Sequence, residues 1–122
     1  MNATPLRQRL REALPAAMKS RDRPAVAALR ATLAAIDNAE AVVVDDGTRQ
    51  SLAIEQTPVG AGAAEATRRV LTEEDVERIV RAEAAEREEA AMAYEKSGHT
   101  DRAEQLRAEA RALTARVNGE SP

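Results

Sequence analysis

The sequence has 122 residues, of which 43% are hydrophobic and 32% charged, and its net charge at pH 7 is −3. It contains no cysteine, phenylalanine or tryptophan and a single tyrosine, which excludes a disulfide framework, a thiolate nucleophile and a cysteine-based metal site. A chain of this length is expected to form one domain. Alanine, the strongest helix former, supplies much of the hydrophobic content, and this composition favours closely packed helices.

The first predicted helix covers about residues 5–20. Thr4 is typical of an N-cap and Pro5 of the first helical position. Apolar residues then recur at helical spacing from Leu6 to Ala17. The pattern therefore predicts an amphipathic helix at the start of the chain.

The second predicted helix covers about residues 23–43. Asp22 is a suitable N-cap and Pro24 falls in the first turn. Val26, Leu29, Leu33 and Ile36 follow at spacings of three and four residues, which places them on one face of a helix.

Residues 45–71 interrupt this periodicity. Asp45-Asp46-Gly47 is typical of a turn, and Pro58 and two glycines follow within residues 57–62. Connections of this length without periodicity are functional loops or disordered segments. We predict a flexible insert at 45–71, with a short β-hairpin between residues 42–44 and 52–54 as the alternative.

Two further helices are predicted in the second half of the chain. Thr72 and Asp75 match a capping box, and the helix that begins there is expected to continue to about residue 97 and end at Gly98. Thr100 is the expected cap of the last helix, which ends at Asn118-Gly119. The short connection implies an antiparallel hairpin. The predicted fold is all-α, with this long hairpin of the third and fourth helices packed on the two N-terminal helices.

Four charged residues fall in or beside the apolar faces of the two longer helices: Arg30, Glu40, Glu83 and Arg87. Buried charges are costly unless they have partners. One interpretation is a network of ion pairs in which the second and third helices bring these charges into contact. The alternatives are an interface for another macromolecule and a catalytic acid/base pair.

A second group of charges makes the N-terminal part of the chain basic. Lysine and arginine outnumber acids within residues 1–30, whereas acids are in excess in the remainder. The candidate RNA-contacting patch consists of Arg7, Arg11, Lys19, Arg21 and Arg23. The alternative is that these are ordinary solvated helix faces.

The remaining residues of interest bear on metal binding, the core and the location of the protein. The single histidine, His99, lies in the Gly98-His99-Thr100 turn and has no second candidate ligand in the pattern, so we expect no metal and no cofactor. Tyr94 is expected to close the core of the helical hairpin. The start of the chain has no apolar signal core and no stretch suits a membrane span, and together with the absence of cysteine this predicts a cytoplasmic protein with no membrane partner.

The order of these residues resembles the GatB/YqeY family. The similarity lies in residues 17–22, 29–30 and 35–40, in the helix start at residues 71–76, and in Glu83, Glu86, Arg87, Ala90, Tyr94, Gly98, Asp101, Ala103, Leu106, Glu109 and Leu113. The resemblance covers most of the chain outside residues 45–71. It implies a single YqeY-like helical domain over residues 1–122, in a short form that lacks the family's second domain.

The resemblance also implies a function. The family is related to the tail of the B subunit of the glutamine-dependent tRNA amidotransferase, which contacts tRNA, and kinship of this kind suggests a carbon–nitrogen ligase with glutamine as amido donor. The sequence has no amidase serine–lysine constellation and no phosphate-binding loop. We therefore predict a non-catalytic binding module that acts on tRNA or on a tRNA-handling protein. A subunit that contributes to amidotransferase activity and a helical protein-interaction scaffold remain as alternatives.

Overall fold

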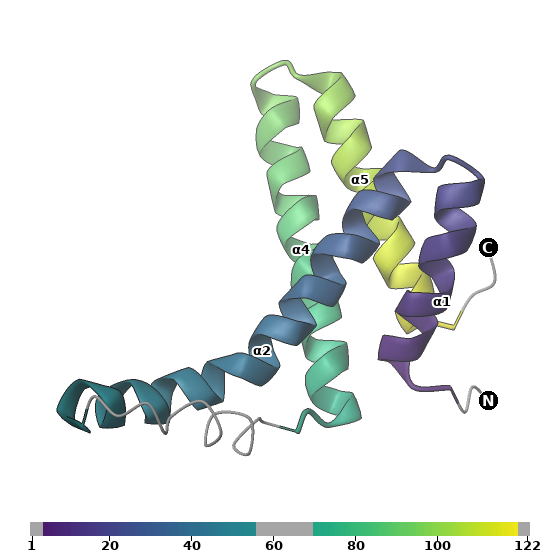
Figure 1. Cartoon of the computed structure of the whole chain (residues 1–122). Helices are drawn as coiled ribbons and strands as arrows, with labels where there is room; N and C mark the ends of the chain where they lie inside the picture. The colour runs from purple at the N-terminus through teal and green to yellow at the C-terminus, as the bar shows by residue number, and fades with distance from the viewer. Residues whose placement is uncertain (1–3, 56–69, 120–122) are drawn as a thin grey trace.

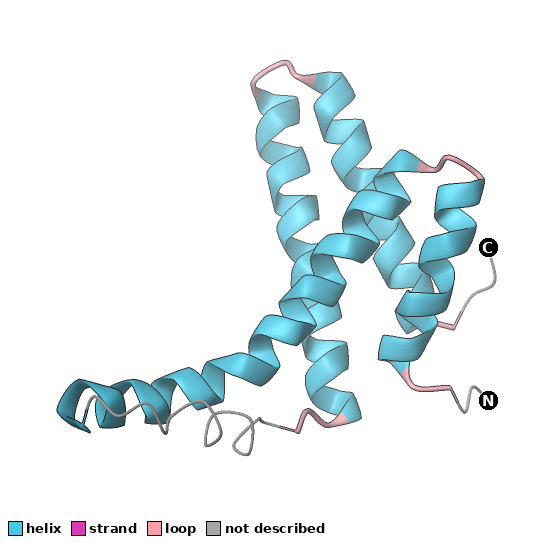
Figure 2. Ribbon diagram, in the orientation of Figure 1, coloured by secondary structure: helices cyan, strands magenta, loops and turns pink. Residues whose placement is uncertain are grey.

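The computed structural model describes the backbone of residues 4–55 and 70–119 and the side chains of residues 4–41 and 70–119. Within these ranges lie four helices: α1 (Leu6–Lys19), α2 (Arg23–Glu55), α4 (Glu73–Lys96) and α5 (Thr100–Val117). The described residues between them are turns and loops, and none forms a strand (Figure 2). The predicted all-α class is confirmed.

The helices form two pairs. Helices α4 and α5 lie side by side as an antiparallel hairpin, and α2 crosses this hairpin while α1 folds back against α2 (Figure 1). The C-terminal part of α2 extends away from the hairpin (Figure 1). The predicted architecture, a long hairpin packed on two N-terminal helices, is therefore confirmed.

The core is built mostly from small aliphatic side chains. All four helices contribute to the main cluster, which contains Leu6, Leu10, Ala17, Ala25, Ala28, Leu29, Ile36, Val76, Val80, Ala84, Ala110 and Leu113. A second cluster of Ala91, Ala103 and Leu106 lies within the hairpin. Alanine methyl groups allow neighbouring helices to approach closely, so a chain with few large apolar residues still buries a continuous core.

Both predicted signals at the ends of α4 are confirmed. The Thr72 hydroxyl accepts a hydrogen bond from the Asp75 N–H, and the Asp75 carboxylate accepts one from the Thr72 N–H, each at 3.0 Å. At the other end Gly98 has a φ of +85°, and the His99 N–H donates to the Tyr94 carbonyl at 2.8 Å. This is the arrangement in which glycine ends a helix without steric cost.

The starts of α1 and α5 differ from the predictions. Pro5, not Thr4, occupies the N-cap position of α1, and its side chain provides no hydrogen bond. The Leu6 N–H instead donates to the Glu73 carboxylate of α4 at 2.8 Å. Tertiary structure therefore supplies the acceptor that the local sequence lacks.

The turn before α5 also corrects the sequence interpretation. His99, not Thr100, is the N-cap residue, and its side chain makes no capping hydrogen bond. Tyr94 lies near this turn with 40% of its surface exposed, so the expectation that it closes the core is wrong. Its ring packs edge-on against His99 and faces the Arg102 guanidinium, with 5.9 Å separating the centroid from each group.

Helix α2 begins as predicted and ends later. The Asp22 carboxylate accepts a hydrogen bond from the Ala25 N–H at 3.2 Å, which confirms the N-cap. The helix continues through Gly47 to Glu55, so the predicted end at residue 43 and the alternative β-hairpin at 42–54 are wrong. A glycine inside a helix costs only about 1 kcal/mol. The rest of the predicted flexible insert, residues 56–69, lies outside the described residues.

Candidate functional site

Arg87 forms the most buried ion-pair cluster among the described residues. Its Nη1 donates to Glu83 Oε1 at 2.9 Å, and its Nε donates to Glu109 Oε1 at 2.8 Å. The side chains are 14% exposed at Arg87, 23% at Glu83 and 6% at Glu109. One guanidinium therefore joins two carboxylates, one from its own helix and one from α5.

The electrostatics of this cluster favour the charged guanidinium. Burial by itself lowers the pKa of Arg87, but the hydrogen bonds that Arg87 donates to Glu83 and Glu109, together with the attraction of both carboxylates, outweigh burial and hold the pKa above its ordinary value. The expected pair of Glu83 and Arg87 is thus present. Glu109 was not among the candidate residues, although it lies three residues after Leu106 and four before Leu113, a spacing that puts it on the apolar stripe of α5.

A second cluster joins α1 to α2. Arg7 Nη1 and Nη2 donate to the two carboxylate oxygens of Glu40 at 2.7 and 3.0 Å, and Nη2 also contacts Asp37. The hydrogen bond to Glu40 is the largest influence that raises the pKa of Arg7. Arg7 is therefore occupied by carboxylates and does not belong to a free basic patch.

These contacts correct the predicted pairing between the second and third helices. Glu40 of α2 forms an ion pair with Arg7 of α1, and Arg87 of α4 forms one with Glu109 of α5. No ion pair among the described side chains joins α2 to α4. Arg30 lies apart from both clusters, exposed on the surface of α2.

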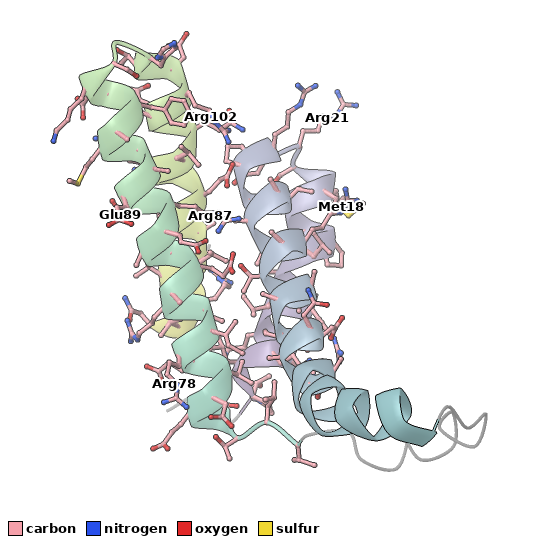
Figure 3. All side chains as sticks on the ribbon, turned by 90° about the vertical axis from the view of Figure 1, so that its left-hand side faces the viewer. Met18, Arg21, Arg78, Arg87, Glu89 and Arg102 are labelled. Atoms are coloured by element: carbon pink, nitrogen blue, oxygen red, sulfur yellow. The ribbon has the colours of Figure 1, made fainter. Side chains whose placement is uncertain are left out.

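Arg30 instead belongs to a basic surface at the corner between α1 and α2. Arg21, Arg23 and Arg30 surround an open hollow of about 540 Å³, whose other lining residues are Met18, Val26 and Ala27. Met18 and Arg21 both lie on the α1–α2 half of the molecule in the side view (Figure 3). We call this surface the basic corner.

The remaining residues of the predicted patch are exposed around this corner. Lys19 precedes the turn, and Arg11 lies on α1 seven residues before Met18, a spacing that puts the two on the same helix face. Four members of the predicted patch thus lie exposed at or near this corner, Arg7 is paired with carboxylates, and Arg30 is a further arginine of the same surface. Sequence periodicity had placed Arg30 at the edge of an apolar stripe, which is why it was assigned to the core network.

The cations of the basic corner have no carboxylate partners among the side chains that the structure describes. Among the described residues, Arg21, Arg23 and Arg30 form no ion pair, and no acidic side chain lines their hollow. Every arginine of α4 differs in this respect, because Arg78 and Arg81 pair with nearby acids and Arg87 pairs with two. The corner therefore carries uncompensated positive charge on a chain that is acidic overall.

Arg21 also has an unusual backbone. Its φ is +60°, and it ends α1 in the position that Gly98 occupies at the end of α4. The Arg21 N–H donates to the Met18 carbonyl at 3.2 Å and the Asp22 N–H to the Ala17 carbonyl at 2.9 Å, the hydrogen-bond pattern that usually requires glycine. A side chain in this left-handed region costs about 1 to 2 kcal/mol.

A second hollow, of about 530 Å³, lies between α1, the start of α2 and α5. Its walls are mainly alanine, and its lining residues are Ala13, Ala16, Ala17, Ser20, Asp22, Ala25, Leu29, Ala108, Arg111, Ala112, Ala115 and Arg116. Asp22 already caps α2. This groove is mainly apolar, with Arg111 and Arg116 from α5 among its lining residues, and so differs in chemistry from the basic corner.

Two properties of the described part of the chain bear on the kind of site. No group of three or more histidine, cysteine, aspartate or glutamate side chains in it is arranged to hold a metal ion. No helix in it has an apolar stretch long enough to cross a membrane.

No protein-family model, curated protein or solved structure matches the chain.

Proposed function

We propose that this chain is a non-catalytic helical module that binds RNA through its basic corner. The observation that carries the proposal is the group of Arg21, Arg23 and Arg30 around one hollow without a carboxylate partner among the described residues. Unpaired guanidinium groups that share one surface attract a polyanion, and the phosphates of RNA bind arginine through short, charge-assisted hydrogen bonds.

The backbone of Arg21 supports the same proposal. A glycine in the left-handed position would end α1 at no steric cost, yet the chain has an arginine there with a φ of +60°. Strained residues of this kind are concentrated at functional sites. The strain is therefore consistent with a requirement for a cation at this point of the surface.

The class of RNA rests on the resemblance to the GatB/YqeY family. The tail of the amidotransferase B subunit, which the sequence resembles, contacts tRNA, so tRNA is the first ligand to test. A tRNA-handling protein with an acidic surface would meet the same cations. The proposed role is binding alone, with amidotransfer chemistry performed by other subunits.

Filter binding of a tRNA transcript at two salt concentrations tests the proposal. We expect weak binding whose log–log salt slope falls by about 0.7 to 0.9 for each arginine that is removed from the corner. The test variants are Arg23→Ala and Arg30→Ala, and Arg78→Ala on α4 is the control because its side chain is 71% exposed and already paired with Asp75.

Arg21→Gly adds a test in which RNA affinity and protein stability are expected to change in opposite directions. The substitution removes a cation and also relieves the left-handed strain, so it should weaken RNA binding while it raises the stability of the protein by about 1 kcal/mol. A general loss of folding would change both quantities in the same direction. Salt-resistant binding that survives replacement of all three corner arginines would contradict the proposal.

A further inference from the structure

The hollow at the basic corner is lined by apolar side chains as well as by arginines. Met18, Val26 and Ala27 line it together with the three arginines. Met18 has 48% of its surface exposed, and Arg30 Nη2 lies 3.9 Å from its sulfur. A surface that served only to contact phosphates would gain nothing from an exposed thioether beside a half-buried valine.

The two parts of the hollow match the two parts of a nucleotide. Phosphate oxygens suit the guanidinium groups, and the flat face of a base can bury apolar area against the soft, polarisable side chain of methionine. The hollow is open to solvent and has a volume of about 540 Å³, so a nucleotide can lie on it without being enclosed. A nucleotide therefore fits the size and the chemistry of the hollow.

The apolar lining of the hollow suits one form of RNA better than the other. In an A-form duplex the base faces are stacked inside the helix, and the surface consists mainly of phosphates and 2′-hydroxyls. A duplex would contact the arginines through its phosphates and leave the apolar side chains uncovered. Unpaired nucleotides in loops and ends have base faces that are free to stack on protein side chains.

We infer that the basic corner binds an unpaired nucleotide of single-stranded RNA, with the base against Met18 and Val26 and the neighbouring phosphates on Arg21, Arg23 and Arg30. This inference rests on the proposed RNA-binding function and specifies its ligand. Met18 is then the residue that separates single-stranded from duplex RNA, whereas the arginines contribute to the binding of both.

Fluorescence anisotropy with two labelled probes tests the inference: a 12-nucleotide oligouridylate and a 12-base-pair RNA duplex. The test variant is Met18→Gln, which keeps a similar side-chain size and removes the apolar surface. Met92→Gln is the matched control, because Met92 is 55% exposed on α4, away from the corner. Circular dichroism confirms that each variant is folded.

We expect the native chain to bind the single strand more tightly than the duplex. Met18→Gln should weaken single-strand binding about fivefold, near the lower limit for an aromatic side chain that stacks on a base, and leave duplex binding and the salt slope unchanged. Arg23→Ala should weaken the binding of both probes and lower the salt slope for the single strand by about 0.7. Met92→Gln should bind both probes as the native chain does.

Two results would overturn the inference while the proposed function stands. One is equal binding of both probes by the native chain, with arginine-dependent affinity for each. The other is an equal loss of affinity for both probes in Met18→Gln, which would assign Met18 a structural role. Absence of binding to either RNA, together with binding of an acidic peptide that needs the corner arginines, would reject the RNA-binding function and the inference with it.

Discussion

Replacement of Arg87 by methionine is expected to remove a large part of the stability of the protein. The Glu109 side chain is 6% exposed and the Arg87 side chain 14%, so the substitution leaves a carboxylate inside the hairpin without its cation. Removal of one member of a buried ion pair costs about 3 to 5 kcal/mol. The total free energy of unfolding of a domain is only about 5 to 15 kcal/mol.

The geometry of the cluster ranks its three members. Glu109→Gln removes a buried charge and keeps an acceptor oxygen for Arg87, so we expect a loss of about 1.5 to 3 kcal/mol, the contribution of a hydrogen bond to a charged group. Glu83→Gln should cost less, about 1 kcal/mol, because Glu83 is 23% exposed and Arg87 retains Glu109. Arg87→Met should therefore be the most destabilising of the three.

The same helix offers a matched control. Arg81 and Glu77 form an ion pair with the same four-residue spacing, but their side chains are 54% and 46% exposed. Exposed helix pairs contribute about 0.3 to 0.5 kcal/mol, so Arg81→Met should be nearly neutral. Urea unfolding, monitored by circular dichroism, measures the free energy of unfolding of both variants. If Arg87→Met unfolds at the same urea concentration as Arg81→Met with an unchanged m-value, the burial argument is refuted.

Three other substitutions test local features of the fold. Thr32→Val should stabilise the protein by about 1 kcal/mol in thermal unfolding, because the Thr32 hydroxyl is buried without a hydrogen-bond partner among the described residues; a clear loss would show that the hydroxyl has a partner. Thr72→Ala removes one half of the capping box and should cost about 1 kcal/mol, with faster amide exchange in the first turn of α4 as its signature. Gly98→Ala should cost about 1 to 2 kcal/mol through its φ of +85° alone, because a Cβ at this position meets no atom within 4 Å; an unchanged melting temperature would argue against the left-handed turn.

Local signals in the sequence were sufficient for the class of the fold and for several helix ends. The cap at Asp22, the capping box of Thr72 and Asp75, and the left-handed Gly98 all involve residues no more than a few positions apart. Helical periodicity likewise identified the apolar faces from which the core is built. A local signal also misled the prediction at Gly47, where the apparent turn lies inside α2.

The partners of the charged side chains required the tertiary structure. Arg7 donates to Glu40, which lies 33 positions later in the chain, and Arg87 donates to Glu109, which lies 22 positions later. The Leu6 N–H donates to Glu73, which lies 67 positions later. None of these contacts follows from the sequence pattern.

The sequence by itself determined that charges lie on apolar faces, because a helical period of 3.6 residues assigns each side chain to a face. It did not determine which helix covers each face, since that depends on how the helices cross and rotate against one another. Tertiary packing placed carboxylates beside Arg7 and Arg87 and, within the described part of the chain, left Arg21, Arg23 and Arg30 without an ion pair. Arginine therefore belongs to the ion-pair clusters between helices at two positions and to the candidate binding surface at three.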